Sequence, residues 1–232
     1  SISHGLKGLL TGLDGGLYLL EKGVEKGSSQ RIQEGLAQST QMVSRIKKLV
    51  LDILYYTKTR HMEWRHSSVR HFVEDTVKII SSKARETRVR IENGVEVNAA
   101  DDLFEADTES LQTALINILE NAIDACIDSP KTTDPKIIFN TQIHPDNVMF
   151  TVQDNGPGID KAALKNIFTI FFSSKGNKGT GLGLYVASKV VQRHRGTIQV
   201  TSEKEQGTSF VIEIPRTVPD TVKNTQGVSY RA

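Results

Sequence analysis

The sequence predicts an α+β protein in which an antiparallel helical hairpin precedes a domain built as an α/β sandwich. Through the first 60 residues, apolar side chains recur at alternating spacings of three and four, which is the pattern of amphipathic helices. Farther along the chain, helical stretches alternate with short runs of β-branched and aromatic residues that are typical of strands. Helices alone therefore come first and a mixture of helices and strands follows, which favours two domains.

Two amphipathic helices account for the N-terminal region. Their apolar side chains are Leu6, Leu10, Leu13, Leu17, Leu20 and Val24 in the first helix and Leu36, Val43, Ile46, Val50 and Ile53 in the second. The residues between them, Gly27, Ser28 and Ser29, are expected to form the turn. One hairpin would leave much of its apolar stripe in water, so a second copy is expected to complete a dimeric four-helix bundle. The alternative is a plain coiled-coil hairpin without chemistry.

The rest of the chain predicts an open mixed sheet with helices on one face. Helices are expected at 69–88 and from Thr108 onward, and strands at 89–91, 103–106, 137–142, 147–152, 197–202 and 208–214. The expected domains are therefore the hairpin at 1–60, a linker at 61–68 and the sandwich at 69–215. Residues 216–232 are polar and without periodicity, which is typical of a flexible tail.

Three segments of the second domain carry chemistry, and the first is ALINILENAIDAC at 114–126. Its apolar residues recur at helical spacing, so Asn117, Asn121 and Asp124 share another face of the helix. Amide oxygens are hard ligands that suit Mg²⁺ beside phosphate groups. We expect Asn121 to bind Mg²⁺ and Asn117 to position a γ-phosphate.

The second segment, DNGPGID at 154–160, follows an alternating strand and breaks into a turn. Asp154 is therefore expected at a strand end, where its carboxylate can accept a hydrogen bond from the amino group of adenine. Gly156 and Gly158 would let a purine approach the backbone.

The third segment, KGTGLGL at 178–184, leads into a helical pattern. Backbone amides at that helix start can hold a polyphosphate, which makes Gly179, Thr180, Gly181, Leu182 and Gly183 a candidate phosphate lid. The segment is neither a dinucleotide fingerprint, because no strand of a βαβ unit precedes it, nor a Walker motif. Each segment alone is a weak signal, but their order predicts an ATP pocket.

From about residue 69 to 215 the chain resembles the ATP-binding domain of sensor histidine kinases, within the larger family that includes gyrase and heat-shock chaperones. The segment IFTIFFSSK at 167–175 resembles the F box of these kinases, with Ile170 where Pro is usual. The resemblance implies that Lys175 precedes the lid and that Thr208, in GTSF, lies beside the adenine-binding Asp154. The end of the N box and the short lid look most like the nitrogen-regulator type.

The same resemblance implies a phosphoacceptor histidine at the start of the first helix, where His4 stands. The other histidines are His61, His66, His71, His144 and His194. The first three fall in a basic stretch that is expected to be a solvated face, and His144 falls in a turn. His194 falls at a helix end, where a basic side chain suits the helix dipole.

Two positions near His4 depart from the family pattern. Gly5 replaces the usual acidic residue, and Gly8 replaces the Thr or Asn implicated in dephosphorylating the partner. Gly12 and Gly16 continue the same row, although each interior glycine costs a helix about 1 kcal/mol relative to alanine. One interpretation is close approach of the ATP domain or a response regulator to this strip, and the other is a helix that bends or frays to relay a signal.

Composition limits the remaining possibilities. A net charge of +2 does not favour nucleic-acid binding, and no apolar run is long enough to cross a membrane. The single cysteine, Cys126, is expected to be a structural thiol in a reducing cytoplasm. The sequence therefore indicates a cytoplasmic fragment without membrane contact of its own, belonging to a larger sensor that could be attached to the membrane upstream.

The expected function is that of a histidine kinase core. It would bind ATP and Mg²⁺, phosphorylate His4 with the help of Asn117, and pass the phosphoryl group to an aspartate of a response regulator receiver domain. Two alternatives stay open: a phosphatase-biased bifunctional kinase, and a nucleotide-binding signalling scaffold with weak or no phosphoryl transfer.

Overall fold

A computed structural model describes residues 2–57, 62–129, 133–172 and 181–217 of the 232-residue chain. The chain forms two compact units, one of residues 1–59 with 167–185 and the other of residues 60–166 with 186–232. The sequence-based domain 69–215 therefore contributes residues 167–185 to the unit that contains the helical hairpin. The five-stranded sheet lies wholly within the other unit.

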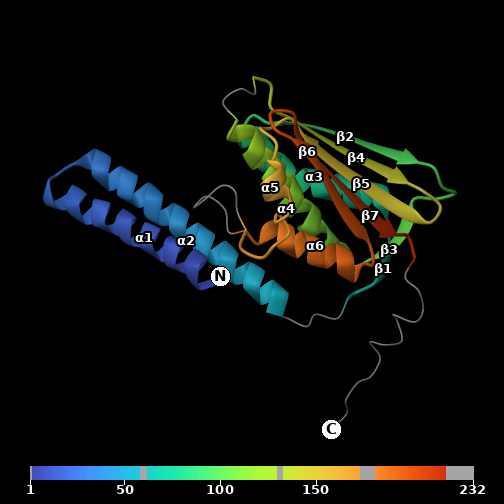
Figure 1. The fold of residues 1–232 in the computed structure, drawn as a ribbon, viewed down its shortest axis with the longest axis horizontal. Helices are drawn as coiled ribbons and strands as arrows, with labels where there is room; N and C mark the ends of the chain where they lie inside the picture. The colour runs from blue at the N-terminus through green and yellow to red at the C-terminus, as the bar shows by residue number, and fades with distance from the viewer. Residues whose placement is uncertain (1, 58–61, 130–132, 173–180, 218–232) are drawn as a thin grey trace, which may run out of the picture. The chain divides into compact units, whose positions relative to one another are not determined.

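The expected helical hairpin is confirmed. Helix α1 runs over Ile2–Glu25 and α2 over Ser29–Thr57, and the two pair along their length (Figure 1). The turn depends on Gly27, whose φ of 62° is unfavourable for other residues. The backbone N–H of Ser28 donates to the carbonyl of Gly23 at 2.8 Å, which closes the last turn of α1.

The glycine strip of α1 packs against α2, which neither sequence-based interpretation anticipated. A Cβ on Gly16 would come within 2.6 Å of the Ser39 hydroxyl and 2.9 Å of the Ser39 backbone nitrogen. From the other side, a Cβ on Gly35 would meet the Gly16 carbonyl at 2.7 Å and the Leu20 nitrogen at 2.6 Å. Gly12 lies against the flexible side chain of Met42. Gly12 and Gly16 therefore serve close packing within the hairpin.

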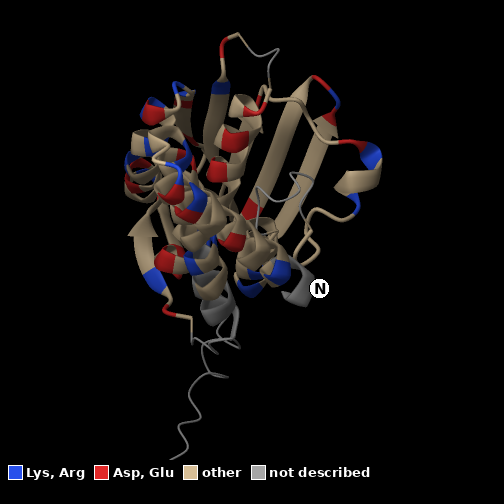
Figure 2. Cartoon of the chain, turned by 90° about the vertical axis from the view of Figure 1, so that its left-hand side faces the viewer, with Lys and Arg blue, Asp and Glu red and all other residues tan. Residues whose placement is uncertain are grey.

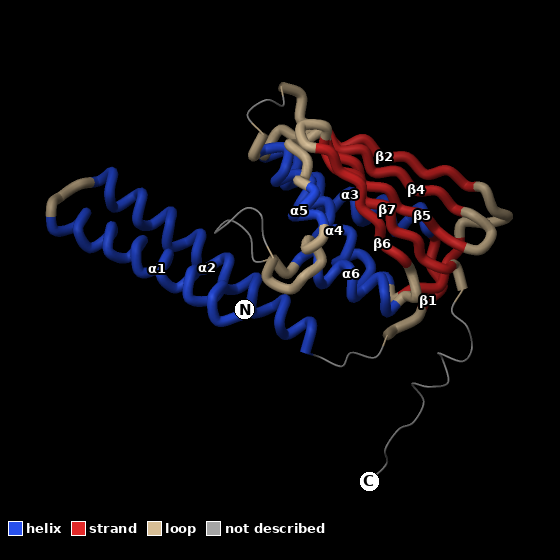
Figure 3. The backbone as a smooth tube through the Cα atoms, viewed as in Figure 1, coloured by secondary structure: helices blue, strands red, loops and turns tan. Residues whose placement is uncertain are grey.

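The second unit contains the mixed sheet that the sequence predicts. Its strands are β2 (Arg90–Val97), β4 (Lys136–Ile143), β5 (Asn147–Asp154), β7 (Gly207–Pro215) and β6 (Thr197–Glu203), in that spatial order. Strands β2 and β4 are parallel, and every other neighbouring pair is antiparallel. Helices α3 (Val69–Glu86), α4 (Thr108–Ile127) and α6 (Gly183–Arg193) cover one face (Figure 3).

The core lies between this sheet face and the helices. Alternate residues of β4, β5 and β7 are buried, because successive side chains of a strand point to opposite faces. Phe72 of α3 packs against Phe104 and Phe150, with ring centroids 5.5 and 5.8 Å apart. The α/β sandwich part of the predicted fold class is thus confirmed.

Two short elements were not anticipated. Strand β1 (Arg65–Ser68) lies within the expected linker and pairs antiparallel with β3 (Leu103–Ala106). Helix α5 (Lys161–Leu164) follows the Asp154 turn and is capped by the Asp160 carboxylate, which accepts from the N–H groups of Ala162 and Ala163. The expected linker is therefore attached to the second unit by a strand ladder.

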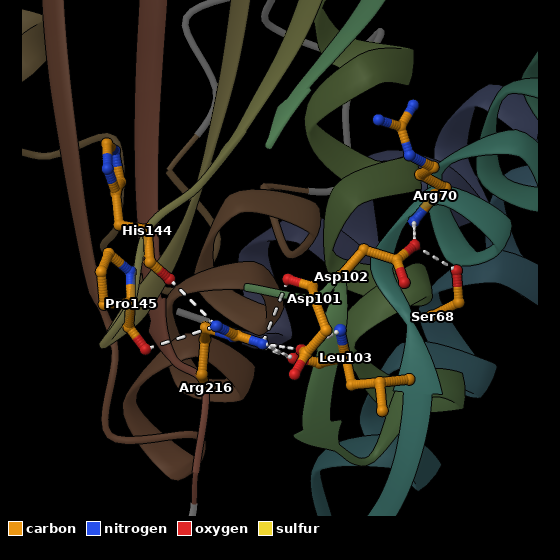
Figure 4. Close-up of polar contacts among 8 residues, drawn as sticks. All are labelled: Ser68, Arg70, Asp101, Asp102, Leu103, His144, Pro145 and Arg216. Atoms are coloured by element: carbon orange, nitrogen blue, oxygen red, sulfur yellow. Dashed lines mark hydrogen bonds and ion pairs between the residues drawn. The ribbon is translucent and has the colours of Figure 1, made fainter. Parts of the chain in front are cut away.

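Arg216 is held firmly, although the sequence assigned it to a flexible tail (Figure 4). Its Nε donates to the Leu103 carbonyl at 2.9 Å, and its guanidinium forms an ion pair with Asp101. Its backbone N–H donates to Asp146, and its carbonyl accepts from Glu105. The pKa of Asp101 is lowered, first by the backbone N–H of Leu103 and then by the Arg216 charge. The sandwich thus extends through Arg216, and residues 218–232 lie outside the described part.

Charged residues of both signs are interspersed over the described helices and loops (Figure 2), in agreement with the net charge of +2. Within the described ranges, no helix is both long enough and apolar enough to span a bilayer.

Candidate nucleotide site

Helix α4 carries the two amides expected to meet nucleotide. The helix begins after Asp107, whose side chain accepts from the N–H of Ser110 at 3.1 Å and so caps the first turn. Asn117 is only 6% exposed, and its Nδ2 has no hydrogen-bond partner among the described residues. A buried donor without an acceptor costs about 1–3 kcal/mol, so a ligand oxygen there would recover that cost.

One and two turns farther along α4 lie Asn121 and Asp124. Asn121 is half-buried, and among the described residues no side-chain hydrogen bond is found for its amide. Asp124 lies 3.0 Å from the Nζ of Lys83 on α3, and the same ammonium is 3.8 Å from Glu120. These ion pairs are about a third exposed, so water screens them and their structural contribution is small.

Asp154 ends strand β5 and is 4% exposed. Its Oδ1 accepts from the backbone N–H of Gly156 at 2.9 Å, which fixes the carboxylate against the turn. Thr208 of β7 lies opposite in the strand register, and its hydroxyl is 3.0 Å from that of Ser202. A carboxylate and a hydroxyl are thus placed side by side at the sheet edge that leads into the turn.

The turn after Asp154 requires its glycines. Gly158 has a φ of 69°, and a Cβ there would overlap the backbone of Glu203. A Cβ on Gly156 would stand 3.0 Å from the carbonyl carbon of Ala125, in the last turns of α4. The turn therefore lies directly against the part of α4 that follows Asn121 and Asp124.

Gly181 of the candidate lid is hydrogen-bonded to Phe171 of the F-box segment, within the same unit. The N–H of Phe171 donates to the carbonyl of Gly181 at 3.0 Å. Both residues have positive φ, 64° for Phe171 and 66° for Gly181, and a Cβ on Gly181 would meet the Phe172 nitrogen at 2.7 Å. Leu182 is buried at 3% exposure, and α6 begins at Gly183. A non-glycine residue at positive φ is uncommon and marks strain at this point.

Several expected site residues have no described side chain. Lys175, Gly179 and Thr180 lie outside the described residues. His4 lies in the first turn of α1, and its side chain is not among those described.

Sequence reasoning missed a buried cluster next to the start of α4. His194, expected to be a charged residue at a helix end, is 2% exposed. Burial lowers its pKa, so the side chain is neutral and the expectation of a favourable charge on the helix dipole was wrong. Its Nε2 accepts from the backbone N–H of Asp107 at 3.2 Å, and its ring meets Trp64 edge to face at 5.2 Å. The capping position of Asp107 before Thr108 was a signal that could have been read.

Comparison with known proteins agrees with this arrangement. Residues 106–218 match the family described as histidine kinase-, DNA gyrase B-, and HSP90-like ATPase. The match covers α4, the Asp154 turn and the start of α6, so the domain is an ATP-binding one.

Relatives extend the similarity to the helical hairpin. The signal transduction histidine-protein kinase AtoS of Escherichia coli strain K12 is 29% identical over 215 residues, which cover 92% of this chain and 34% of AtoS. The sensor histidine kinase ZraS of the same strain is 27% identical over 229 residues, which cover 97% of this chain and 46% of ZraS. The chain thus spans less than half the length of either relative. The similarity agrees with the nitrogen-regulator type expected from the sequence.

A solved structure shows the same two-part fold. The crystal structure of histidine kinase ThkA in complex with response regulator protein TrrA is similar with a TM-score of 0.73 and 25% identity, over 93% of this chain and 60% of that chain. Over most of its length the chain is therefore similar in sequence and in fold to sensor histidine kinases.

Proposed function

We propose that this core uses ATP to phosphorylate His4 and then passes the phosphoryl group to an aspartate of a response regulator. The observation that best supports the proposal is the buried amide of Asn117, which lacks a partner among the described residues. It lies one turn from Asn121 on a helix that packs against the Asp154 turn. A phosphate oxygen could accept a hydrogen bond from this unpaired donor, which is the kind of convergent polar group that a ligand pocket supplies.

The described residues suit both ends of the nucleotide. Asp154 would accept from the adenine amino group, with Thr208 beside it and Gly156 and Gly158 allowing the ring to approach. Asn117 would donate to the γ-phosphate. Lys175 and the segment from Gly179 to Gly183 would close over the phosphates, with backbone amides as donors.

Mg²⁺ fits the donor set of α4. Asn121 would hold it through the amide oxygen, a hard ligand, and Asp124, which forms an ion pair with Lys83, follows on the same face of the helix. Bound there, the ion would neutralise charge on the phosphate oxygens. His4, as the neutral imidazole, would attack the γ-phosphorus in line, while the protein supplies position and charge neutralisation.

We propose further that the hairpin pairs with a second copy. Two rows of apolar side chains, each spaced by seven residues, stay exposed on the hairpin: Leu10, Leu17 and Val24 on α1 and Leu36, Val43 and Val50 on α2. Their exposed fractions run from 46% to 69%. Apolar rows at heptad spacing are typical of helices that pack into a bundle. A homodimeric four-helix bundle would cover both rows.

The relatives support the partner that we propose and the longer protein to which this core would belong. ThkA was solved with a response regulator protein, and we propose a receiver domain of that kind as the phosphoryl acceptor here. We also propose that this core, which the sequence predicts to be cytoplasmic, is part of a longer sensor, because AtoS and ZraS are both more than twice as long as the region they share with it.

Incubation with γ-labelled ATP and Mg²⁺ tests the kinase reaction. We expect an acid-labile label on the wild-type chain, loss of that label in His4→Gln, and full labelling of His66→Gln, a control at an exposed histidine. Tight ATP binding without label would instead indicate a signalling scaffold. Steady hydrolysis without a phosphoprotein would indicate an ATPase of the gyrase or chaperone kind. If the protein removes phosphate from a phosphorylated regulator faster than it labels the unphosphorylated regulator, a phosphatase bias is indicated.

A further inference from the structure

The neutral imidazole of His194 connects three segments of the second unit. His194 directly follows α6, and its Nδ1 lies 2.9 Å from the Val190 carbonyl of that helix. Its Nε2 lies 3.2 Å from the backbone nitrogen of Asp107, which can only donate. Nε2 is therefore the acceptor and Nδ1 carries the proton, so one tautomer satisfies both contacts.

Asp107 joins the imidazole to the start of α4 and to the linker. Its Oδ1 accepts from Ser110 in the first turn of α4, and its Oδ2 accepts from the backbone N–H of Glu63 at 3.3 Å. The residue before it, Ala106, pairs with Arg65 in the β1–β3 ladder. A single carboxylate therefore fixes both the N-terminus of α4 and the segment that leads from the hairpin.

Trp64 completes the connection from the linker side. Its ring meets His194 edge to face at an interplanar angle of 76°. The neighbouring Met62 is 8% exposed, so the linker packs into the sandwich here. The indole Nε1 is buried and has no partner among the described residues. Packing against the imidazole thus holds the indole in a place where its N–H lacks an acceptor, which costs folding free energy. A different position of the linker would give this N–H a partner and recover that free energy.

Both helices that meet at His194 also carry nucleotide-site residues. Helix α4 is capped by Asp107 and carries Asn117 and Asn121, and α6 begins at Gly183, which is one of the expected phosphate-binding glycines. A rigid helix transmits a displacement of one end to the other, so the position of the linker and the position of these site residues are mechanically related.

We infer that His194 is a positioning residue that couples the linker to the two helices of the nucleotide site. Nucleotide binding at α4 would shift the linker at Trp64, and a shift of the linker would in turn reorient Asn117 on α4. The coupling is reciprocal, as any coupling between two binding equilibria must be. The inference rests on the proposed function, because it concerns the same nucleotide site.

Protonation would break this contact. An imidazolium cannot accept from the Asp107 N–H, because both of its nitrogens carry protons. The charged groups that act on the ring are Asp107, which favours protonation, and Arg193 of α6, which opposes it, while Glu63 and Arg65 of the linker pair with each other at 2.7 Å. Burial is the strongest influence and lowers the pKa of His194 below its ordinary value of 6.5.

The sign of the pH effect follows from that direction. The unfolded chain takes up the proton at a higher pH than the folded protein does. The contribution of neutral His194 to stability is therefore fully present above about pH 6.5 and is lost as the pH falls through the folded pKa. Lowering the pH through the same range should uncouple the linker from the nucleotide site.

Trp64 is the only tryptophan of the chain, so tryptophan fluorescence reports on the surroundings of this one side chain. At pH 7.5 we expect a non-hydrolysable ATP analogue with Mg²⁺ to change the Trp64 emission of the full chain. In His194→Phe, which keeps an aromatic ring but has no acceptor, the change should fall at least about fivefold while calorimetry still detects binding. In His194→Gln, whose side-chain oxygen can accept from Asp107, the change should be largely retained and should no longer depend on pH between 5 and 7.5.

Labelling kinetics separate positioning from simple destabilisation. We expect His194→Phe to slow labelling of His4 at saturating ATP about tenfold, with less than a threefold change in KM. A matched control is His144→Phe, which alters a histidine in the β4–β5 turn and should leave both values near wild type. If His194→Phe fails to fold, the wild type is compared with His194→Gln instead. The measured quantities are then the pH dependence of Trp64 emission and of His4 labelling.

The outcomes distinguish the two proposals. Normal binding heat with an unchanged Trp64 emission in the wild type would overturn the coupling and leave the nucleotide site intact. Absence of binding heat would overturn the nucleotide site itself. Equal losses of kcat and binding in His194→Phe and His194→Gln would show a structural role only.

Discussion

In the sheet domain the side chains of Phe104, Phe139 and Phe150 are at most 1% exposed, whereas in the helical hairpin Leu17 and Leu36 are more than half exposed. The sheet domain buries large side chains between two layers and so completes its own core. The hairpin buries Leu49 and Met42 and brings its helices close together at glycines, but it leaves two rows of large apolar side chains exposed. The difference supports the proposal that the hairpin pairs with a second copy, whereas the sheet domain buries its aromatic core within one copy.

The largest effect should come from the aromatic core of the sheet domain. Phe150 packs against Phe72 and Phe139, with ring centroids 5.8 and 6.4 Å apart. We expect Phe150→Ala to lower the free energy of unfolding by about 3–5 kcal/mol, because it removes buried area and leaves a cavity. Urea unfolding of the full chain measures the loss. Ile79→Ala, at a side chain 52% exposed, is the control and should change stability by less than about 0.5 kcal/mol. Equal effects of the two variants would contradict the burial described for this core.

The next effect should appear in association and not in folding. Leu17 is 51% exposed and lies in the middle of the apolar row of α1. A charge at this position would be buried in both copies of a bundle, so we expect Leu17→Glu to weaken dimerisation at least about tenfold, or about 1.4 kcal/mol. Light scattering over a dilution series gives the mass. Ile79→Glu places the same charge on the sheet domain and should leave the mass unchanged. A dimer that survives Leu17→Glu would show that the exposed rows are not the interface.

Much of this contrast could be predicted from the sequence. The hairpin, the mixed sheet and the start of α4 follow from periodicities of 3.6 and 2 and from turn residues, which are local signals. The order of the three glycine- and asparagine-containing segments likewise indicates a nucleotide site from residue types and spacing alone.

What could not be predicted depends on contacts between distant residues. The glycines of α1 were interpreted through what could approach from outside, because the sequence does not show that Gly16 meets Gly35. His194 was interpreted as a basic side chain at a helix end, because its contacts with Trp64 and Asp107 are made by residues 130 and 87 positions away in the chain. Strand β1 is four residues long and polar, so neither its length nor its pattern distinguishes it from a linker.

The smallest effect, and the one that tests the hairpin most directly, concerns Gly16. In an exposed helix, Gly→Ala is stabilising by about 1 kcal/mol, and that is what the sequence alone would suggest. The structure reverses the sign, because a Cβ on Gly16 would meet backbone atoms of Ser39 and Gly35, which cannot rotate away. Overpacking costs about 1–3 kcal/mol, so Gly16→Ala should be destabilising by a net amount of about 1 kcal/mol in urea unfolding.

Gly12→Ala is the matched control, since it makes the same change one turn earlier in α1. Its Cβ would meet only the Met42 side chain, with Sδ at 2.8 Å and Cγ at 3.3 Å. Met has three rotatable bonds and can move aside, so the gain in helix propensity should offset the contact and leave stability nearly unchanged. If both variants were stabilising to the same degree, the helices would have room to spare at Gly16 and the hairpin would not depend on close backbone contact. If only Gly16→Ala is destabilising, the contact between backbones determines the spacing of the helices, and with it the position of the two exposed apolar rows.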